Sequence, residues 1–321
     1  MISVLVPQNR IGGLDVLWQG LAHQTEKNFE LILVDAIKPR RSIGTENPFR
    51  WTHVEPRDNP FPAVSFCRSM NTAIAHARGD TLLMLCDYSF LHPNCLELHA
   101  EMQKKHRGPV TFDYRYVTMP ALHPDVPSYR ETEPGTEENA AAYTAAVNAN
   151  ADRYVADLDA GKLDRFMWSV FAEPFRGVDG LAVEHEHKPS GADLANDWNY
   201  CSAKNESVPT ELMLEMNGFD EAYDRSHCYQ DSEWSYRLRE RGIRWHAGPP
   251  GHTVSVVNPR PWSNIKRLEK PLFFNRELCF GSRRAELRLP VNPEFILRNW
   301  RRKTIGIVAA DTPNLPRSIL R

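Results

Sequence analysis

Apolar runs and helical periodicities alternate over the N-terminal quarter of the chain. Short apolar runs at residues 2–6, 29–34 and 81–86 predict three buried strands. Between them, apolar residues recur at helical spacing over residues 14–21 and 65–77, which predicts two helices that each bury one face. This order of strands and helices predicts an α/β fold with a parallel sheet covered by helices.

An aspartate follows two of the predicted strands. Asp35 ends the run at residues 29–34, and Asp87 comes directly after the run at residues 81–86. In open parallel sheets, ligands bind at the carboxyl ends of the strands. Each aspartate taken alone is equally compatible with a turn residue, but the two together indicate a ligand site at one edge of the sheet.

A turn and an acidic helix entrance mark the second half of the chain. The Asn217-Gly218 pair ends a predicted helix over residues 211–216, and a polar loop leads to another helix on which Trp234 and Leu238 share one face. Asp231 lies at the entrance of that helix, where a rigid element would direct its carboxylate toward a neighbouring cleft. The alternative is an acidic residue that only interacts favourably with the helix dipole.

The composition is that of an ordinary globular protein. A length of 321 residues with 41% hydrophobic and 25% charged residues predicts one large α/β domain with an appendage, or two domains. The six cysteines lack the paired spacing of a zinc site and are interpreted as reduced thiols. The apolar segment at residues 1–7 is too short for a signal peptide. No apolar run approaches the ~20 residues that a membrane-spanning helix needs. We therefore expect a cytoplasmic protein.

The net charge of −2 hides an uneven distribution. Residues 260–321 carry 14 Lys or Arg against 5 Asp or Glu. In the rest of the chain, acidic residues outnumber basic ones. A basic extension on an acidic body favours an anionic partner such as lipid phosphate, nucleic acid or a polyanionic glycan, and with lipid it would attach the protein peripherally to a membrane. The alternative is a solvated helix face or a contact for self-association.

The order of these features resembles the inverting family 2 glycosyltransferases of the GT-A fold. The matching segments are residues 2–7, 24–35, 71–80 and 83–97 on the nucleotide side, and residues 198–209 and 217–242 on the acceptor side, the last with a galactosyltransferase-like motif. The resemblance implies an α/β fold of GT-A type, which is a Rossmann-like three-layer structure with a mixed sheet, here with a helical insert and a C-terminal extension.

The resemblance also divides the chain. It implies a nucleotide-sugar-binding half at residues 1–112 and an acceptor and catalytic half at residues 198–258. Residues 113–197, where the resemblance fades, are interpreted as an insert that shapes the acceptor site. Residues 259–321 form the basic C-terminal extension.

On the donor side, the resemblance implies contacts to a UDP-sugar. Asp35 would contact the uracil base, Arg78 would line the nucleotide pocket, and Asp87 would face the diphosphate and its metal ion. Pro7 and Asn71 lie in the matched segments and are further candidates for nucleotide-sugar binding.

The implied metal site is reduced relative to the family pattern. Ala36 replaces the second aspartate after the second strand, and Cys86-Asp87-Tyr88 replaces an Asp-x-Asp motif. Asp87 alone supplies few of the hard oxygen ligands that Mn²⁺ or Mg²⁺ requires. The resemblance implies a histidine ligand beyond the catalytic aspartate, and His252 fits this position better than His246.

On the acceptor side, Asp231 matches the general base of the family, and Gln230 replaces the Glu that usually precedes it. By the same resemblance, Asn205, Ser207 and Gln230 are candidates for hydrogen bonds to the acceptor or the donor sugar. Trp198 would stack on a sugar ring. The alternative for Trp198 is a core aromatic side chain.

This resemblance implies an inverting glycosyltransferase of hexosyltransferase type that moves a sugar from a UDP-sugar to the hydroxyl group of a glycan, a lipid-linked acceptor or a nucleic acid. Two alternatives stay open. A sugar-nucleotide nucleotidyltransferase would share the nucleotide half but would not need the motif at residues 217–242. A non-catalytic GT-A-like binding protein for an anionic polymer would explain Ala36, Cys86 and Gln230 together.

Overall fold

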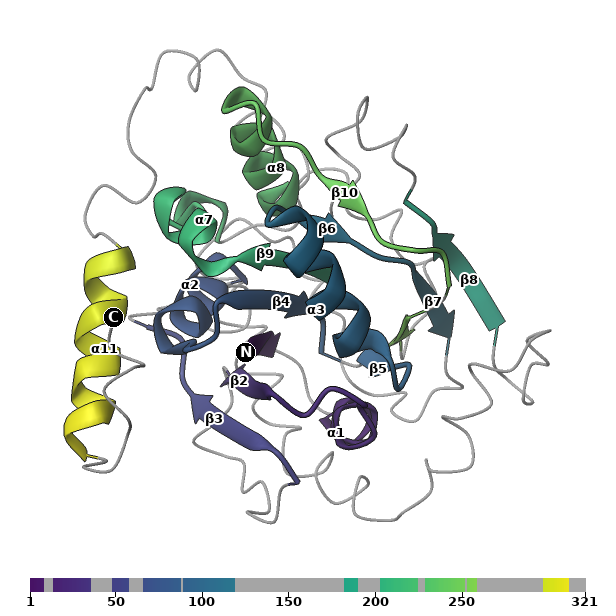
Figure 1. Cartoon of the computed structure of the whole chain (residues 1–321), viewed down its shortest axis with the longest axis horizontal. Coiled ribbons are helices and arrows are strands. Elements are labelled where there is room, and N and C mark those ends of the chain that lie inside the picture. The colour runs from purple at the N-terminus through teal and green to yellow at the C-terminus, as the bar shows by residue number, and fades with distance from the viewer. Residues whose placement is uncertain are drawn as a thin grey trace, which may run out of the picture.

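A computed structural model of the chain describes residues 1–8, 14–35, 48–57, 66–87, 89–118, 182–189, 203–224, 229–251, 253–258 and 297–311 (Figure 1). The strands form a seven-stranded sheet in the order β10-β6-β9-β4-β1-β2-β3 and a four-stranded sheet in the order β5-β11-β7-β8. None of the helices within these ranges combines the length and the apolar character needed to cross a membrane.

The predicted strands and helices of the nucleotide half are present with small shifts at their ends. The strands are β1 (Ile2–Gln8), β2 (Phe29–Asp35), β3 (Arg50–Val54), β4 (Thr81–Leu85), β5 (Ser89–Leu91), β6 (Val110–Thr111), β7 (Tyr114–Thr118), β8 (Ala182–His187), β9 (Asn205–Pro209), β10 (His246–Ala247) and β11 (Val254–Asn258). The helices are α1 (Leu14–Ala22), α2 (Phe66–His76), α3 (Cys95–His106), α7 (Thr210–Glu215), the short 3₁₀ helix η4 (Glu221–Tyr223), α8 (Gln230–Glu240) and α11 (Leu297–Asp311).

Strands β1 to β4 are parallel, and β9 joins them antiparallel to β4. From β1 the sheet grows in one direction through β2 and β3, and the chain then returns to place β4 on the other side of β1. The carboxyl ends of β1 and β4 therefore flank the point where the strand order reverses, which is where open α/β sheets bind ligands. The predicted Rossmann-like three-layer fold with a mixed sheet is confirmed.

Alternate residues of the central strands are buried on opposite faces of the large sheet. Leu5 and Ile32 belong to a core that α2, α7, α8 and α11 cover. Val4 and Leu31 belong to a second core that α1 and α3 cover. Because successive side chains of a strand point to opposite faces, short apolar runs supply both cores at once.

The smaller sheet joins segments that are far apart in the sequence. Strand β11 pairs in parallel with β7 and antiparallel to β5, and β7 pairs with β8. Both ends of the predicted insert at residues 113–197 thus contribute strands to a sheet shared with the acceptor half. The helical part predicted for that insert lies outside the described residues.

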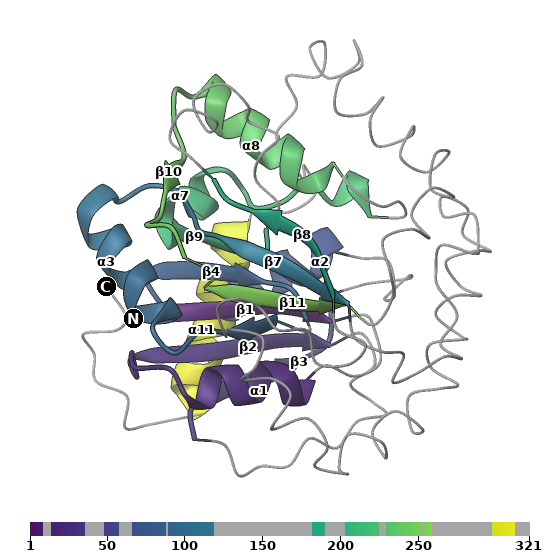
Figure 2. The same ribbon diagram turned by 90° about the vertical axis from the view of Figure 1, so that its right-hand side faces the viewer.

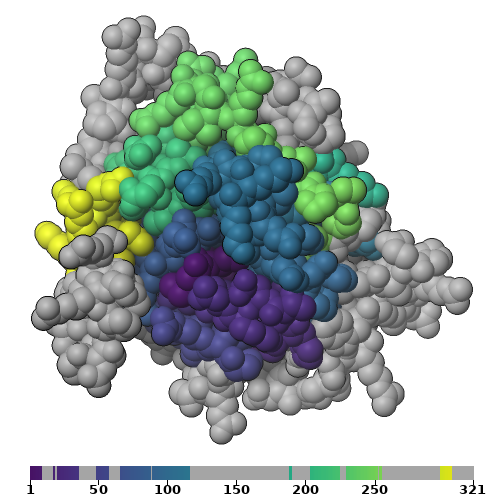
Figure 3. Space-filling model, viewed as in Figure 1, coloured from purple at the N-terminus to yellow at the C-terminus, as the bar shows by residue number. Residues whose placement is uncertain are grey.

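The described part of the basic C-terminal extension is a helix, α11, that packs against the body beside α2 and α7 (Figure 3). Leu297 is fully buried in the first core, and its N–H donates to Asn217 Oδ1 at 2.8 Å. One turn later, Arg301 Nε donates to the carbonyl oxygen of Ala77 at 3.1 Å. Arg302 is exposed. Part of the extension is therefore a structural element of the domain.

Replacing Leu297 with Ala is expected to lower the free energy of unfolding by about 2–5 kcal/mol, because it leaves a cavity where α11 meets α2 and α7. Chemical denaturation measures this change. The control is Arg302→Ala on the exposed side of the same helix, which should stay within about 0.5 kcal/mol of wild type. Equal effects of the two substitutions would show that α11 does not dock through Leu297.

Candidate active site

Three buried polar side chains lie level with one another at the carboxyl ends of β2, β1 and β4. Gln8 is directly opposite Asp35 in the register of β1 and β2. Strands β1 and β4 are in register at Leu5 and Met84, so three residues further on Gln8 is level with Asp87. The exposed fractions of Asp35, Gln8 and Asp87 are 0%, 1% and 3%. Since neighbouring strands lie about 4.8 Å apart, the two acids are separated by about 10 Å along this edge.

Asp35 has a partner that the sequence analysis missed. His53 Nε2 lies 3.0 Å from Asp35 Oδ2, and the His53 ring stacks on Trp51 with ring centroids 5.4 Å apart. His53 reaches Asp35 because β3 is the parallel neighbour of β2. No sequence spacing marks a histidine on a later strand as a partner of this aspartate. Pro7 is half-buried beside Gln8 at the end of β1, and its contact with a nucleotide stays a prediction.

Asp231 lies in the first turn of α8, as predicted, and is half-buried. Its Oδ1 accepts a hydrogen bond from Ser232 N at 2.9 Å. Burial raises the pKa of Asp231, while the ammonium of Lys204 and backbone hydrogen bonds act to lower it. The backbone enters the helix through Tyr229 with φ 68°, a left-handed conformation that aromatic residues rarely adopt. Gln230 is half-buried beside it, and its contact with an acceptor stays a prediction.

Lys204 connects Asp231 with the carboxyl edge of the sheet. It directly precedes β9, and Asn205 is paired with Leu85 of β4, so Lys204 is level with Cys86 and next to Asp87. Figure 2 agrees: the α8 end that continues to β10 lies on the side of the N-terminus, so the first turn of α8 points to the side where β1 ends. Asp231 and the strand ends therefore share one side of the molecule.

Arg78 does not lie at this edge, so the prediction that it lines the nucleotide pocket is wrong. Its backbone N–H donates to Glu30 Oε1 at 2.7 Å, and its Nη1 lies 3.7 Å from Glu30 Oε2. Glu30 is near the start of β2, five residues before Asp35, which corresponds to about 16 Å of strand. The physical reason is that α2 runs back along the sheet and returns the chain to the amino ends of the strands.

Asn205 and Ser207 do not face a sugar site, so their predicted role is wrong as well. Both are fully buried on the face of β9 that α3 covers. His99 Nε2 donates to Asn205 Oδ1, and its Nδ1 accepts from the Ser207 hydroxyl, each at 2.9 Å. Asn205 Nδ2 also donates to the carbonyl oxygen of Asp113, and Gln103 Nε2 donates to Ser207 Oγ. Burial lowers the pKa of His99 to about 4, so this buried network contains a neutral imidazole.

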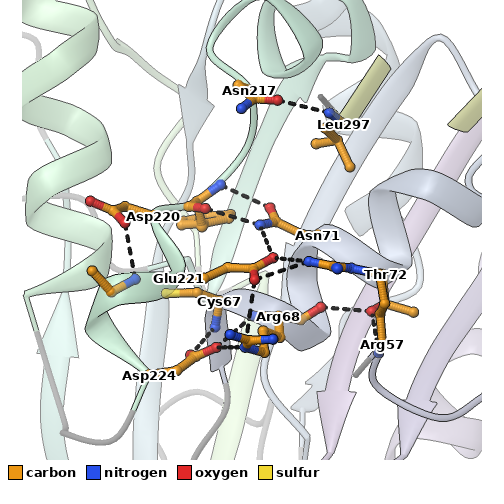
Figure 4. A network of polar contacts seen from close by, with 12 residues as sticks. Arg57, Cys67, Arg68, Asn71, Thr72, Asn217, Asp220, Glu221, Asp224 and Leu297 are labelled. Atoms are coloured by element: carbon orange, nitrogen blue, oxygen red, sulfur yellow. Dashed lines mark hydrogen bonds and ion pairs between the residues drawn. The ribbon is translucent and has the colours of Figure 1, made fainter. Parts of the chain in front are cut away.

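Asn71 also has a structural role in place of the predicted nucleotide contact (Figure 4). Its Oδ1 accepts from Phe219 N at 2.9 Å, and its Nδ2 donates to Phe219 O at 2.9 Å and to Glu221 Oε1 at 3.0 Å. Gly218 has φ +71°, and a Cβ at this position would collide with Asn71 Oδ1 and meet Leu297 Cδ2 at 2.8 Å. The turn at Asn217-Gly218 thus joins α2 closely to the motif that precedes α8.

The acidic residues of the same motif bind the start of α2. Asp224 accepts from the backbone N–H groups of Cys67 at 2.8 Å and Arg68 at 3.0 Å, which caps the helix (Figure 4). Glu221 accepts from Arg57 Nη2 at 3.0 Å, and Arg68 Nε lies 3.5 Å away from it. These contacts attach the segment before α8 to a helix that packs directly on β1 and β2.

Helix α8 is anchored to the turn that precedes this segment. Arg237 Nη1 donates to Met216 O at 2.7 Å, and its Nη2 donates to Gly218 O at 2.8 Å. Trp234 is buried against Phe219, with ring centroids 5.7 Å apart. The position of Asp231 is therefore determined by a chain of contacts that runs from α2 through the turn to α8.

The predicted metal site is only partly within the described residues. Trp198 and His252 lie outside them. Within the described ranges, no three His, Cys, Asp or Glu side chains form a group that could hold a metal ion. His246, the second candidate, instead stacks on His106 with ring centroids 4.1 Å apart. Asp87 by itself does not fit the oxygen-rich ligand set that Mn²⁺ or Mg²⁺ requires.

Comparison with known proteins gives matches at the level of structure. No protein-family model matches the chain, and no curated protein matches its sequence. Residues 1–349 of S. aureus TarS in complex with UDP are similar with a TM-score of 0.46 and 13% identity, over 99% of this chain and 73% of that one. The mannosyltransferase PcManGT from Pyrobaculum calidifontis, in complex with GDP-Man and Mn²⁺, is similar with a TM-score of 0.45 and 16% identity, over 99% and 77%. Likeness at this level does not establish a family or an activity for this chain.

The pH dependence of stability is expected to report on Asp224. Burial raises its pKa to about 7, although hydrogen bonds from Arg68 and Cys67 act to lower it. Since the ordinary value is 3.8, the folded protein keeps a proton that the unfolded chain releases between about pH 4 and pH 7. The free energy of unfolding should therefore fall as the pH rises through this window.

Chemical denaturation of wild type and Asp224→Asn across this window checks the expectation. The substitution removes the titrating group, so the pH dependence should become weaker. Glu215→Gln, at an exposed position on α7, is the control and should keep the wild-type dependence. Parallel curves for wild type and Asp224→Asn would refute the assignment.

Proposed function

We propose that this protein is an inverting glycosyltransferase that uses a nucleotide-sugar donor, with Asp231 as the general base. The observation that carries the proposal is a half-buried carboxylate with a raised pKa, within electrostatic reach of Lys204, beside the edge that bears Asp35 and Asp87. Burial makes a carboxylate a stronger base, which suits it to take a proton from a hydroxyl group.

A UDP-sugar is the proposed donor. Asp35, with His53 holding one of its oxygens, is the candidate for the uracil base, as the resemblance to family 2 implies. Asp87 lies further along the same edge, where the diphosphate would lie, and Pro7 flanks the row. The separation of about 10 Å between the two acids suits a ligand with a base at one end and phosphates at the other.

The proposed transfer is a single displacement at the anomeric carbon. The acceptor oxygen forms a bond to that carbon while the bond to the diphosphate oxygen breaks, and the electron pair of the broken bond leaves with UDP. The hydroxyl proton passes to Asp231. Attack opposite to the leaving group inverts the anomeric configuration. The acceptor is the hydroxyl group of a glycan, a lipid-linked molecule or a nucleic acid, with Gln230 and Trp198 as candidates to hold it.

No step of this mechanism is assigned to a metal ion, because the described residues do not fit a resident one. The resemblance to family 2 implied binding of Mn²⁺ or Mg²⁺ by Asp87 and His252, of which His252 lies outside the described residues. Calorimetric titration of UDP with and without the ion tests it directly. The exposed basic residues of α11 keep an anionic partner or self-association as further proposals.

Asp231→Asn is expected to lower kcat for sugar transfer by about 10²- to 10⁴-fold while leaving UDP affinity close to wild type, because the base acts only on the acceptor. Release of UDP from a panel of UDP-sugars with a glycan acceptor measures this. The wild-type rate should fall as the pH drops through the raised pKa of Asp231, since only the ionised carboxylate is a base. Glu240→Gln, an exposed acid at the other end of α8, is the control.

Asp35→Asn is expected to weaken UDP binding by about 10-fold or more, because it removes a buried charge from the base-contacting position. Isothermal titration calorimetry measures the affinity, and Glu101→Gln, at an exposed position on α3, serves as the control.

UDP binding without turnover, unchanged by Asp231→Asn, would favour the non-catalytic binding protein. Pyrophosphate release from UTP or CTP would favour the nucleotidyltransferase.

A further inference from the structure

The proposed reaction leaves a negative charge that the expected metal site does not account for. When the bond to the sugar breaks, the diphosphate gains charge that must be neutralised. Asp87 is the remaining acid of the reduced motif, and within the described residues no group of three potential ligands surrounds it. A positively charged side chain near Asp87 could neutralise the diphosphate in place of a metal ion.

Lys204 is placed to provide that charge. It lies level with Cys86, one strand away from Asp87, because Asn205 is paired with Leu85. Its side chain is half-buried, and its ammonium acts on the carboxylate of Asp231. Its ammonium is therefore within electrostatic reach of the proposed base, and its backbone lies at the start of the strand beside the proposed position of the diphosphate.

The surroundings of Lys204 restrict its position. Its Nζ lies over the ring of Tyr114, 5.8 Å from the ring centroid, and Tyr114 is itself buried at the start of β7. The preceding residue, Ala203, has φ 52°, and its N–H is held by Glu206 Oε2 at 2.7 Å. Left-handed backbone at a non-glycine residue is uncommon and clusters at functional sites. Ala203, directly before Lys204, and Tyr229, two residues before Asp231, both show it.

Three arginines of the described part bind acidic residues away from Asp87. Arg57 and Arg68 bind Glu221 in the network that holds the segment before α8. Arg78 binds Glu30 at the opposite edge of the sheet. Lys204, by contrast, is a described cation that the strand register brings level with the residue before Asp87.

We propose that Lys204 neutralises the departing diphosphate, so that the transfer proceeds without a metal ion. This role rests on the proposed function. The ammonium stays protonated throughout: the anomeric carbon exchanges its diphosphate oxygen for the acceptor oxygen, the proton goes to Asp231, and Lys204 donates a charge-assisted hydrogen bond to the oxygen that leaves with UDP.

The test compares UDP with uridine as ligands of the full chain, by calorimetry in EDTA and in Mn²⁺. Lys204→Gln should weaken UDP binding by about 10- to 100-fold and leave uridine binding unchanged, because only UDP carries the phosphates. Lys204→Arg should restore most of the affinity for UDP. Lys104→Gln, an exposed lysine on α3, is the matched control and should bind both ligands as wild type does. Wild-type affinity for UDP should be the same in EDTA and in Mn²⁺.

The outcomes separate this role from the proposed function. A wild-type protein that binds UDP, with an affinity that Lys204→Gln does not change, overturns the role of Lys204 alone. Equal losses for UDP and uridine would show a structural effect and also overturn it. Binding of UDP that requires Mn²⁺ assigns the charge to the ion instead. Wild type that binds neither ligand overturns the proposed function together with this role.

Discussion

The attachment of the Gly218–Asp224 segment to α2 is the constraint on which the candidate site depends. Phe219 is fully buried, and its backbone N–H and carbonyl both form hydrogen bonds with the amide of Asn71. Buried backbone groups nearly always need such partners, so this side chain helps to hold the segment in place. Asp224 adds a second attachment at the first turn of α2. Since α2 packs on β1 and β2, the start of α8 is held relative to the sheet.

The electrostatics of the site follow from this placement. Burial at the start of α8 disfavours the charged form of Asp231, and Lys204 acts in the opposite direction. The result is a carboxylate that is more basic than a solvated one and still has a cation nearby. The same lysine lies beside Asp87 through the pairing of β9 with β4. The pairing of β9 with β4 thus places Lys204 near Asp231 on the proposed acceptor side and near Asp87 on the proposed donor side.

The polar residues of the matched motifs do not all face the proposed site. The direction in which each side chain points along its strand or helix decides whether it faces the site or the protein interior. Asn205 and Ser207 are two residues apart on β9, so both point toward α3, where His99 and Gln103 satisfy them. Asn71 faces the turn at Asn217-Gly218. A buried asparagine or serine must have partners, and either a ligand or the protein itself can supply them.

Local periodicity and turn residues were enough to predict the order of strands and helices, the two-faced core and the positions of Asp35, Asp87 and Asp231 at the ends of elements. Which side chains meet depends on how these elements pack together. The contact of His53 with Asp35 and the electrostatic interaction of Lys204 with Asp231 join residues that lie on different elements. Arg78 was assigned to the wrong edge for the same reason: proximity in sequence to β4 does not say at which end of the sheet a residue lies. Strand order and register are non-local properties, and no spacing within a single segment encodes them.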